Sequence, residues 1–297
     1  MLLYLYMRVL TVNKDNIKLE TYLLEAFKVL NFNKLSKYLK ENKIKVNGKK
    51  VPLNTQLRKG DEIKLFILDE FLEDKPLSIE KKDIIYEDDN ILVAFKKAGL
   101  VTIDEDVTID SLDRRIKTYL NTQEGSVCHR LDTGTSGLVI FAKNSATEEI
   151  LLNEIKSHTL KKFYTCVTFG WPKENEGTIQ NYLLKSDDGF VKVFKTKVEN
   201  SKEAITKYRV LQKKNELALL DVEILTGRTH QIRVHMKSLG CPILGDSKYG
   251  NEDANRKYKK KRQCLCAYKI VLPTLTGALS NISNKTFEID KPKFDLF

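Results

Sequence analysis

The chain has few cysteines, and those it has are scattered. Its five cysteines, at positions 128, 166, 241, 264 and 266, are odd in number and lack the regular spacing of a disulfide framework. A reducing cytoplasm is therefore the expected location. Cys264 and Cys266 form the one close pair, but a structural zinc site needs a second pair. We predict instead that these two cysteines lie on one face of a strand.

Long apolar runs are also missing. The stretch MLLYLYMRVL is apolar for seven residues before Arg8, which is too short to span a membrane. It also lacks the basic leading region and small-residue cleavage site of a signal peptide. We predict a strand here, or a true start at Met7. No other stretch approaches membrane length, so no membrane association is expected.

Charge is unbalanced in favour of lysine and arginine. The 297 residues include 51 Lys+Arg against 40 Asp+Glu, a formal charge of +11, with 41% hydrophobic and 31% charged residues. This is an ordinary globular composition, long enough for two domains. A basic balance favours a polyanionic partner, nucleic acid first. Lysine also serves solubility, so the charge favours nucleic acid only slightly.

The first part of the chain predicts a small basic module. Leucines at helical spacing predict helices over residues 18–30 and 33–42. In KIKVNGKKV, Asn47-Gly48 between short β-prone runs predicts a hairpin. A turn at Gly60-Asp61 and the strand EIKLFIL follow. The module would then be two short helices and a small sheet, with a basic helix and a basic hairpin.

This arrangement resembles the alpha-L RNA-binding motif, which is found in a ribosomal small-subunit protein and in several RNA-modifying enzymes. The resemblance covers residues 16–68, with an N-terminal extension over 1–15 and a charged linker containing Pro76 over 69–82. It implies that the helix and hairpin grip RNA phosphates, which position a protein without reading sequence. A solvated lysine face is the alternative. The lysines that would bind RNA are Lys34, Lys37, Lys40, Lys43, Lys45, Lys49 and Lys50.

Residues 83–297 predict a second, larger domain. Strands are expected on both sides of Asp88-Asp89-Asn90 and over 138–142, 161–170 and 217–224. The capping box Ser145-Ala146-Thr147-Glu148 predicts the start of one helix. TGRTHQIRVHMKSLGCP predicts another, with stop signals at Gly240 and Pro242. Many strands with few helices, and no β-α-β alternation, predict an α+β fold with a mixed, mainly antiparallel sheet.

The segment HRLDTGTSGLVIFAKN places one carboxylate at a Thr/Gly/Ser turn. Aspartic proteases use Asp-Thr-Gly, but they need two carboxylates that share a proton, and this chain has no second such motif. ATPases that phosphorylate an aspartate use a similar Asp-Lys-Thr-Gly-Thr, but that lysine is absent here. Taken alone, Asp132 would be read as a turn residue whose side chain bonds the backbone.

The wider context favours a different interpretation. HRLDTGTSGLVIFAKN resembles the central motif of the RluA-type pseudouridine synthases, which act on ribosomal and transfer RNA. IIYEDDNILVAFKKAGL is similar to the opening hairpin of that family, KKFYTCVTFG to its tyrosine strand, and GRTHQIRVHMKSLGCPILGDSKYG to its basic motif. The resemblance covers residues 83–275. Two positions depart from it: Lys97 replaces a usual proline, and Cys266 a usual histidine, where we expect a local packing change.

The resemblance implies catalytic roles for three residues. The family needs no cofactor and no metal, because the substrate carries its own leaving group. Asp132 would act on the ribose, either as a nucleophile or as a base at carbon 2. Arg233 would pair with it and favour its charged form. Tyr164 would stack on the uracil and help a proton leave carbon 5.

Four further residues are predicted to bind the substrate. The uridine must flip out of its stack, and Arg130 would fill the vacated space. His129 would support the same loop, with a purely structural role equally expected. Leu244 would pack against the pocket, and Arg228 would take a phosphate-binding or structural role.

The sequence thus favours an enzyme that isomerises uridines in RNA. We expect a monomer, with ribosomal RNA favoured as the substrate and transfer RNA as the alternative. A non-catalytic RNA-binding or ribosome-assembly protein of the same fold is the competing interpretation. The Asp132, Tyr164 and Arg233 set argues against it, because a carboxylate repels phosphate.

Overall fold

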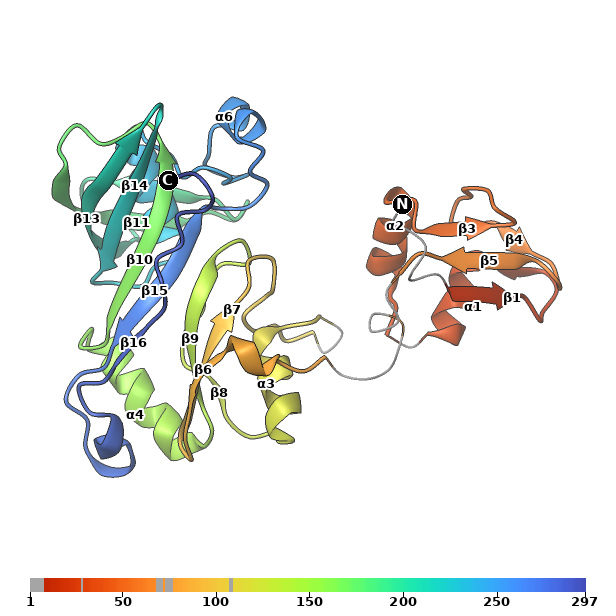
Figure 1. Cartoon of the computed structure of the whole chain (residues 1–297), viewed down its shortest axis with the longest axis horizontal. Helices are drawn as coiled ribbons and strands as arrows, with labels where there is room; N and C mark the ends of the chain where they lie inside the picture. The colour runs from red at the N-terminus through yellow and green to blue at the C-terminus, as the bar shows by residue number, and fades with distance from the viewer. Residues whose placement is uncertain (1–7, 28, 68–71, 73–76, 107–108) are drawn as a thin grey trace. The chain divides into compact units, whose positions relative to one another are not determined.

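The computed structural model describes residues 8–27, 29–67, 72, 77–106 and 109–297. The chain divides into two compact units, residues 1–77 with 106–108, and residues 78–105 with 109–297 (Figure 1). Each unit has its own apolar core. In the described residues, no helix is both long and apolar enough to cross a membrane.

The small unit combines two helices with two small sheets. Its core contains Leu19 and Leu23 of the first helix and Leu35 of the second, all fully buried, which follows from their helical spacing. A three-stranded antiparallel sheet has the order β1-β5-β3, and β2 pairs with β4. The elements are β1 (Arg8–Thr11), β2 (Ile17–Lys18), α1 (Leu19–Ala26), α2 (Phe32–Lys40), β3 (Ile44–Val46), β4 (Gln56–Leu57) and β5 (Glu62–Leu65).

The predicted hairpin is only partly present. Asn47 and Gly48 both have positive φ, 48° and 76°, and Val46 and Lys49 exchange two backbone hydrogen bonds of 2.9 Å, so the turn forms. The chain then diverges, however, and β3 pairs with β5 instead of with the residues that follow the turn. A sequence signal for a turn does not specify how far the pairing extends.

The predicted boundaries of the small unit also need correction. Strand β1 pairs with β5, so Arg8–Thr11 belongs to the sheet of the small unit and not to a separate extension. The strand predicted at residues 1–7 lies outside the described residues, as does half of the predicted linker, including Pro76. Leu72 is buried in the small core and Ile79 in the large one. The larger unit therefore begins at residue 78, five residues before the predicted start at 83.

The larger unit is built on one sheet of 11 strands, with the order β12-β11-β13-β14-β10-β15-β9-β7-β6, while β8 pairs with β9 and β16 with β15. All its pairings are antiparallel except that of β9 with β15, which confirms the predicted mixed sheet. The strands are β6 (Ile84–Glu87), β7 (Ile91–Lys96), β8 (Ser126–Val127), β9 (Ser136–Ala142), β10 (Lys161–Phe169), β11 (Glu176–Lys185), β12 (Val191–Phe194), β13 (Lys202–Lys214), β14 (Leu217–Ile224), β15 (Leu265–Val271) and β16 (Thr286–Glu288).

The helices of the larger unit are α3 (Leu112–Leu120), α4 (Ser145–Lys156), α5 (Gln231–Ser238) and α6 (Glu252–Lys257), with 3-10 turns at Lys81–Asp83 and Gly277–Ile282. The N-cap of α4 is Asn144, whose side chain accepts from Thr147 N, and not Ser145 as the capping box suggested. Helix α5 is shorter than predicted, because the preceding TGRTH forms a loop.

The parallel contact between β9 and β15 joins the two halves of the sheet (Figure 1). Gly137 lies opposite Ala267, and a Cβ atom at Gly137 would come within 2.3 Å of the Ala267 carbonyl oxygen. Its φ of +130° also lies in a region that suits glycine. The strands can therefore approach at this point because residue 137 has no side chain.

The two cysteines predicted to share a strand face are both buried, but only Cys266 lies within β15, because the strand begins at Leu265. Cys266 faces Thr165 of β10 on one side and Ser136 of β9 on the other. It therefore occupies the centre of the sheet, where its burial raises the pKa of the thiol to about 11.

Candidate active site

A cavity of about 990 Å³ opens in the larger unit where three segments meet. These segments are the 128–135 loop between β8 and β9, the 227–233 segment that leads into α5, and part of the sheet that includes Tyr164 and Ile224. The two loops carry most of the charged residues, while the sheet supplies Tyr164, Ile224 and Leu265 together with Lys185 at the end of β11. This combination suits a ligand that has both a flat ring and polar groups.

The backbone of the 128–135 loop is fixed at several points. The buried Thr102 hydroxyl donates to Leu131 O at 2.8 Å and accepts from Leu131 N. Thr135 N donates to Asp132 O at 2.9 Å, which closes the turn, and Gly99 N donates to Thr133 O. Asp132 is therefore carried on a rigid loop, as a reacting group requires.

Lys96 lies beneath the same loop and is completely buried. Its ammonium donates to Leu100 O at 2.7 Å and more weakly to Thr133 O at 3.4 Å. Burial lowers its pKa to about 8, although the nearby charge of Asp132 acts in the opposite direction. Lys96 thus stabilises the loop through backbone carbonyls, without an ion-pair partner among the described residues.

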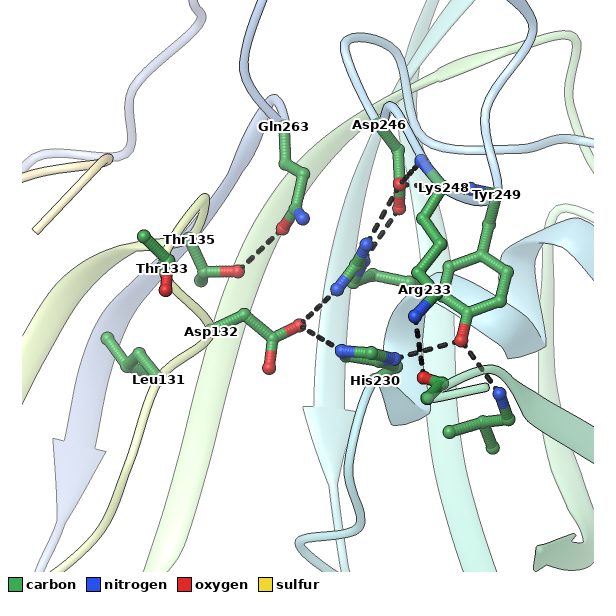
Figure 2. Close-up of polar contacts among 12 residues, drawn as sticks. Leu131, Asp132, Thr133, Thr135, His230, Arg233, Asp246, Lys248, Tyr249 and Gln263 are labelled. Atoms are coloured by element: carbon green, nitrogen blue, oxygen red, sulfur yellow. Dashed lines mark hydrogen bonds and ion pairs between the residues drawn. The ribbon is translucent and has the colours of Figure 1, made fainter. Parts of the chain in front are cut away.

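Asp132, Arg233 and Asp246 form a chain of ion pairs (Figure 2). Arg233 Nη1 donates to Asp132 Oδ2 at 2.7 Å. On its other edge Arg233 binds Asp246 through two bonds, Nε to Oδ2 at 2.7 Å and Nη2 to Oδ1 at 2.9 Å. The side chain of Asp132 is 27% exposed, while those of Arg233 and Asp246 are 5% and 0% exposed. Asp132 is therefore the member of the chain that a ligand can reach.

The opposite charges of Asp132, Arg233 and Asp246 stabilise one another. Burial opposes the charge on Arg233, but the hydrogen bonds and charges of Asp246 and Asp132 outweigh it and raise the pKa of the guanidinium. Burial likewise opposes the charge on Asp246. Hydrogen bonds from Arg233 and from the backbone N–H groups of Tyr249 and Lys248 nevertheless lower the pKa of that carboxyl. Arg233 and Asp246 thus form a fixed ionised pair. The sequence predicted that Arg233 would contact Asp132, but it did not predict this second contact with Asp246.

His230 approaches the same oxygen of Asp132 that Arg233 binds, with Nε2 3.9 Å from Oδ2 (Figure 2). The Tyr249 hydroxyl is 2.8 Å from His230 Nδ1 and accepts a bond from Val191 N at 2.9 Å. The direction of the bond between Tyr249 and His230 depends on the histidine tautomer. In the tautomer that accepts at Nδ1 from the hydroxyl, the proton is on Nε2 and an N–H group faces Asp132.

Gln263 forms a second connection between the 128–135 loop and Arg233. Its amide lies 2.8 Å from the Thr135 hydroxyl. With the amide nitrogen turned toward Thr135, the oxygen accepts from Nε and Nη2 of Arg233, each at 3.1 Å. The loop and α5 are therefore linked both through Asp132 itself and through this second bridge.

Tyr164 forms part of the cavity wall on β10 and is 6% exposed. Burial, and then the charges of Asp132 and Cys266, raise the pKa of its hydroxyl. The tyrosine therefore stays neutral and offers a ring and a hydroxyl beside the carboxylate. The structure thus brings together all three residues predicted to be catalytic.

Among the residues predicted to bind substrate, the two arginines line the cavity and Leu244 does not. Arg130 is exposed and lines the cavity. Arg228 also lines it, although its Nε donates to Glu203 O at 2.8 Å. Leu244 was placed wrongly: it is fully buried in a separate apolar cluster with Val167 and is not among the cavity-lining residues. The turn after Pro242 carries it beneath the sheet and away from the site.

His129 is buried and neutral. Its Nε2 accepts from Ile140 N at 3.3 Å, which attaches the loop to β9. Burial lowers its pKa to about 3, helped by the charge of Lys162. This geometry agrees with loop support, which a structural histidine would also provide.

The predicted RNA-binding lysines lie on α2, on β3, in the turn after β3 and, for Lys43, between α2 and β3. Lys37, Lys40, Lys49 and Lys50 are exposed. The others are partly buried and have local contacts: Lys34 Nζ donates to Val29 O at 3.0 Å, Lys43 pairs with Glu41 at 2.7 Å, and Lys45 lies over the Phe66 ring. The four exposed lysines are therefore the ones most available to a ligand.

Comparison with known proteins agrees with this geometry. The family model for RNA pseudouridylate synthases matches residues 90–238. A Rickettsia bellii protein named ribosomal large subunit pseudouridine synthase C is 36% identical over 263 residues, covering 82% of this chain and 86% of that protein. A Borreliella burgdorferi protein named ribosomal large subunit pseudouridine synthase D is 34% identical over 282 residues, covering 89% and 84%.

A solved structure of an RNA pseudouridylate synthase domain is also similar to this chain. Human RNA Pseudouridylate Synthase Domain Containing 1 superposes with a TM-score of 0.58 at 26% identity, over 74% of this chain and 84% of that one. Its similarity, together with the sequence matches and the charged cavity, leads to one conclusion. The chain belongs to the RNA pseudouridylate synthase family and is an isomerase that acts on RNA.

Proposed function

We propose that this protein converts specific uridines of large-subunit ribosomal RNA to pseudouridine, with Asp132 as the reacting carboxylate. The names of the relatives from Rickettsia bellii and Borreliella burgdorferi support the choice of RNA. The contact of Arg233 with Asp132 carries the assignment of the carboxylate: an accessible acidic group, fixed by a buried arginine, opens onto a cavity large enough for a nucleoside.

The reaction breaks the bond between N1 of uracil and C1′ of ribose, turns the base and joins C5 to C1′. The proton on C5 then leaves to solvent. Asp132 either attacks C1′ or removes a proton at C2′, and both roles need its ionised form. Arg233 places its positive charge 2.7 Å from Asp132 Oδ2 and is itself held by a bidentate contact with Asp246.

Other residues position the uridine. Tyr164 stacks on the uracil, and its neutral hydroxyl helps the C5 proton to leave. Arg130, exposed at the rim of the cavity, fills the space from which the uridine has flipped. Arg228 holds the 227–233 segment through its bond to Glu203 O and is available to a phosphate on its exposed side.

The small unit gives affinity without sequence specificity. Its exposed lysines on α2 and at the Asn47-Gly48 turn contact phosphates, as the resemblance of this unit to the alpha-L motif implies. We propose that a monomer is the active species.

Tritium release identifies the RNA. Large-subunit ribosomal, small-subunit ribosomal and transfer RNA, each carrying tritium at C5 of uridine, are incubated separately with the native protein. We expect release to water from the large-subunit RNA alone. Release from transfer RNA alone would show that transfer RNA, and not ribosomal RNA, is the substrate. Binding of RNA without any tritium release would support a non-catalytic RNA-binding protein.

A further inference from the structure

Lys162 lies on the cavity side of β10, two residues before Tyr164. In a β-strand, residues two apart point to the same face. The cross-strand partner of Lys162 is Ile224 of β14, which lines the cavity together with Tyr164. Lys161, by contrast, points to the opposite face and is exposed.

The ammonium of Lys162 lies close to both loops of the site. A Cβ atom at Gly227, which lines the cavity, would lie 3.4 Å from Lys162 Nζ. Its charge also lowers the pKa of His129 in the 128–135 loop. Lys162 Nζ is therefore close to Gly227 and within electrostatic range of His129, two residues that line the cavity, although Lys162 is not itself a lining residue.

This ammonium has no counter-ion in the part of the chain that the structure describes. Within the described residues it makes no hydrogen bond or ion pair, and its side chain is only partly exposed. Burial lowers its pKa, and no carboxylate offsets that effect. A partly desolvated charge without a partner is unfavourable in the free protein, so a lysine kept in this state suits a site that binds an anion.

We propose that Lys162 binds a backbone phosphate of the RNA next to the flipped uridine. The proposal rests on the proposed function, because a nucleotide bound at Asp132 and Tyr164 brings its own phosphates to the cavity. The phosphate supplies the counter-ion that the protein lacks. The alternative is that Lys162 only packs its aliphatic stem against the sheet.

The variants Lys162→Met and Lys161→Met test the proposal. The first removes the charge on the cavity face, and the second removes an adjacent charge on the opposite face. Tritium release from ribosomal RNA gives kcat/KM over a series of KCl concentrations. Thermal unfolding of both variants is measured alongside.

We expect kcat/KM of Lys162→Met to fall about tenfold, as for the loss of one charged hydrogen bond. The slope of log kcat/KM against log salt should shrink by about 0.7, the value for one phosphate contact with a single strand. The Tm should stay the same or rise, because an unfavourable charge is gone. Lys161→Met should change none of these quantities by a comparable amount.

An unchanged salt slope in Lys162→Met, or a lower Tm that accounts for the lost activity, would overturn the proposal in favour of a packing role. Equal effects of both variants would also overturn it. Filter binding of ribosomal RNA to the same variants needs no turnover. If the native protein releases no tritium, the proposed function fails, while the salt slope of binding still decides the role of Lys162.

Discussion

Arg233 Nη1 lies 2.7 Å from Asp132 Oδ2, while the opposite edge of the same guanidinium is held by both oxygens of Asp246. Asp246 in turn accepts from the backbone N–H groups of Lys248 and Tyr249. Helix α5 and the loop after Asp246 therefore fix the arginine before any ligand arrives. Asp132 and Arg233 line the cavity, whereas Asp246 lies behind them and is not among the lining residues.

Replacing Arg233 with lysine should lower kcat about 100-fold. An ammonium cannot bind both oxygens of Asp246 and still reach Asp132, so the carboxylate loses its fixed orientation. Steady-state tritium release measures the effect. Arg209→Lys is the control, because the Arg209 side chain is 63% exposed and should tolerate the change. Activity of Arg233→Lys within threefold of the native enzyme would contradict this role.

Gly137→Ala should destabilise the fold strongly, by about 3 kcal/mol or more. The new Cβ atom would come within 2.3 Å of the Ala267 carbonyl oxygen, where β9 meets β15. Gly240→Ala is the matched control: it also has positive φ, but its Cβ would meet open space, so a cost of about 1 kcal/mol is expected. Urea unfolding measures the free energy of unfolding of both variants. Equal losses would show that the close contact between β9 and β15 does not require glycine at residue 137.

The free energy of unfolding should fall as the pH drops from about 6.5 toward 3. Burial lowers the pKa of His129 to about 3 and that of His235 to about 4. In this range the two histidines are protonated in the unfolded chain but not in the folded protein. Each histidine therefore lowers the free energy of unfolding by about 1.4 kcal/mol for each pH unit. In urea titrations at several pH values, the free energy of unfolding of His129→Gln should depend less on pH than that of the native protein. Equal pH dependence of the two proteins would refute the lowered pKa of His129.

Arg130→Ala should reduce turnover more on structured RNA than on a short single strand that contains the same uridine. The arginine is needed to fill a vacated stack, and a single strand has little stacking to replace. The ratio of kcat/KM for the two substrates, compared with the same ratio for the native enzyme, measures this. Equal losses on both substrates would exclude a role in flipping.

Much of the fold and site could be predicted because it depends on local patterns. Alternation over 161–170 predicted β10, the run LALLDVEI predicted β14, and the Thr/Gly/Ser turn after Asp132 predicted the loop. Asp132, Tyr164 and Arg233 came from motifs, and they meet at one cavity although 101 residues separate Asp132 from Arg233.

The remaining features depend on long-range packing, which sequence patterns do not specify. Lys96 looks like any other lysine among the 51 basic residues, yet it is fully buried under the loop. Asp246 and His230 lay within recognised motifs, but only the folded structure shows which atoms they contact. Leu244 was misplaced because its motif position did not indicate which side of the sheet it would reach.

The most direct test of the central claim is tritium release from C5-labelled ribosomal RNA by the native protein and by Asp132→Asn. Asparagine keeps the size of the side chain but provides neither a nucleophile nor a base. Release by the native protein and none by the variant, with RNA binding retained in both, is the predicted result. Release by Asp132→Asn at a rate near that of the native protein would contradict the account.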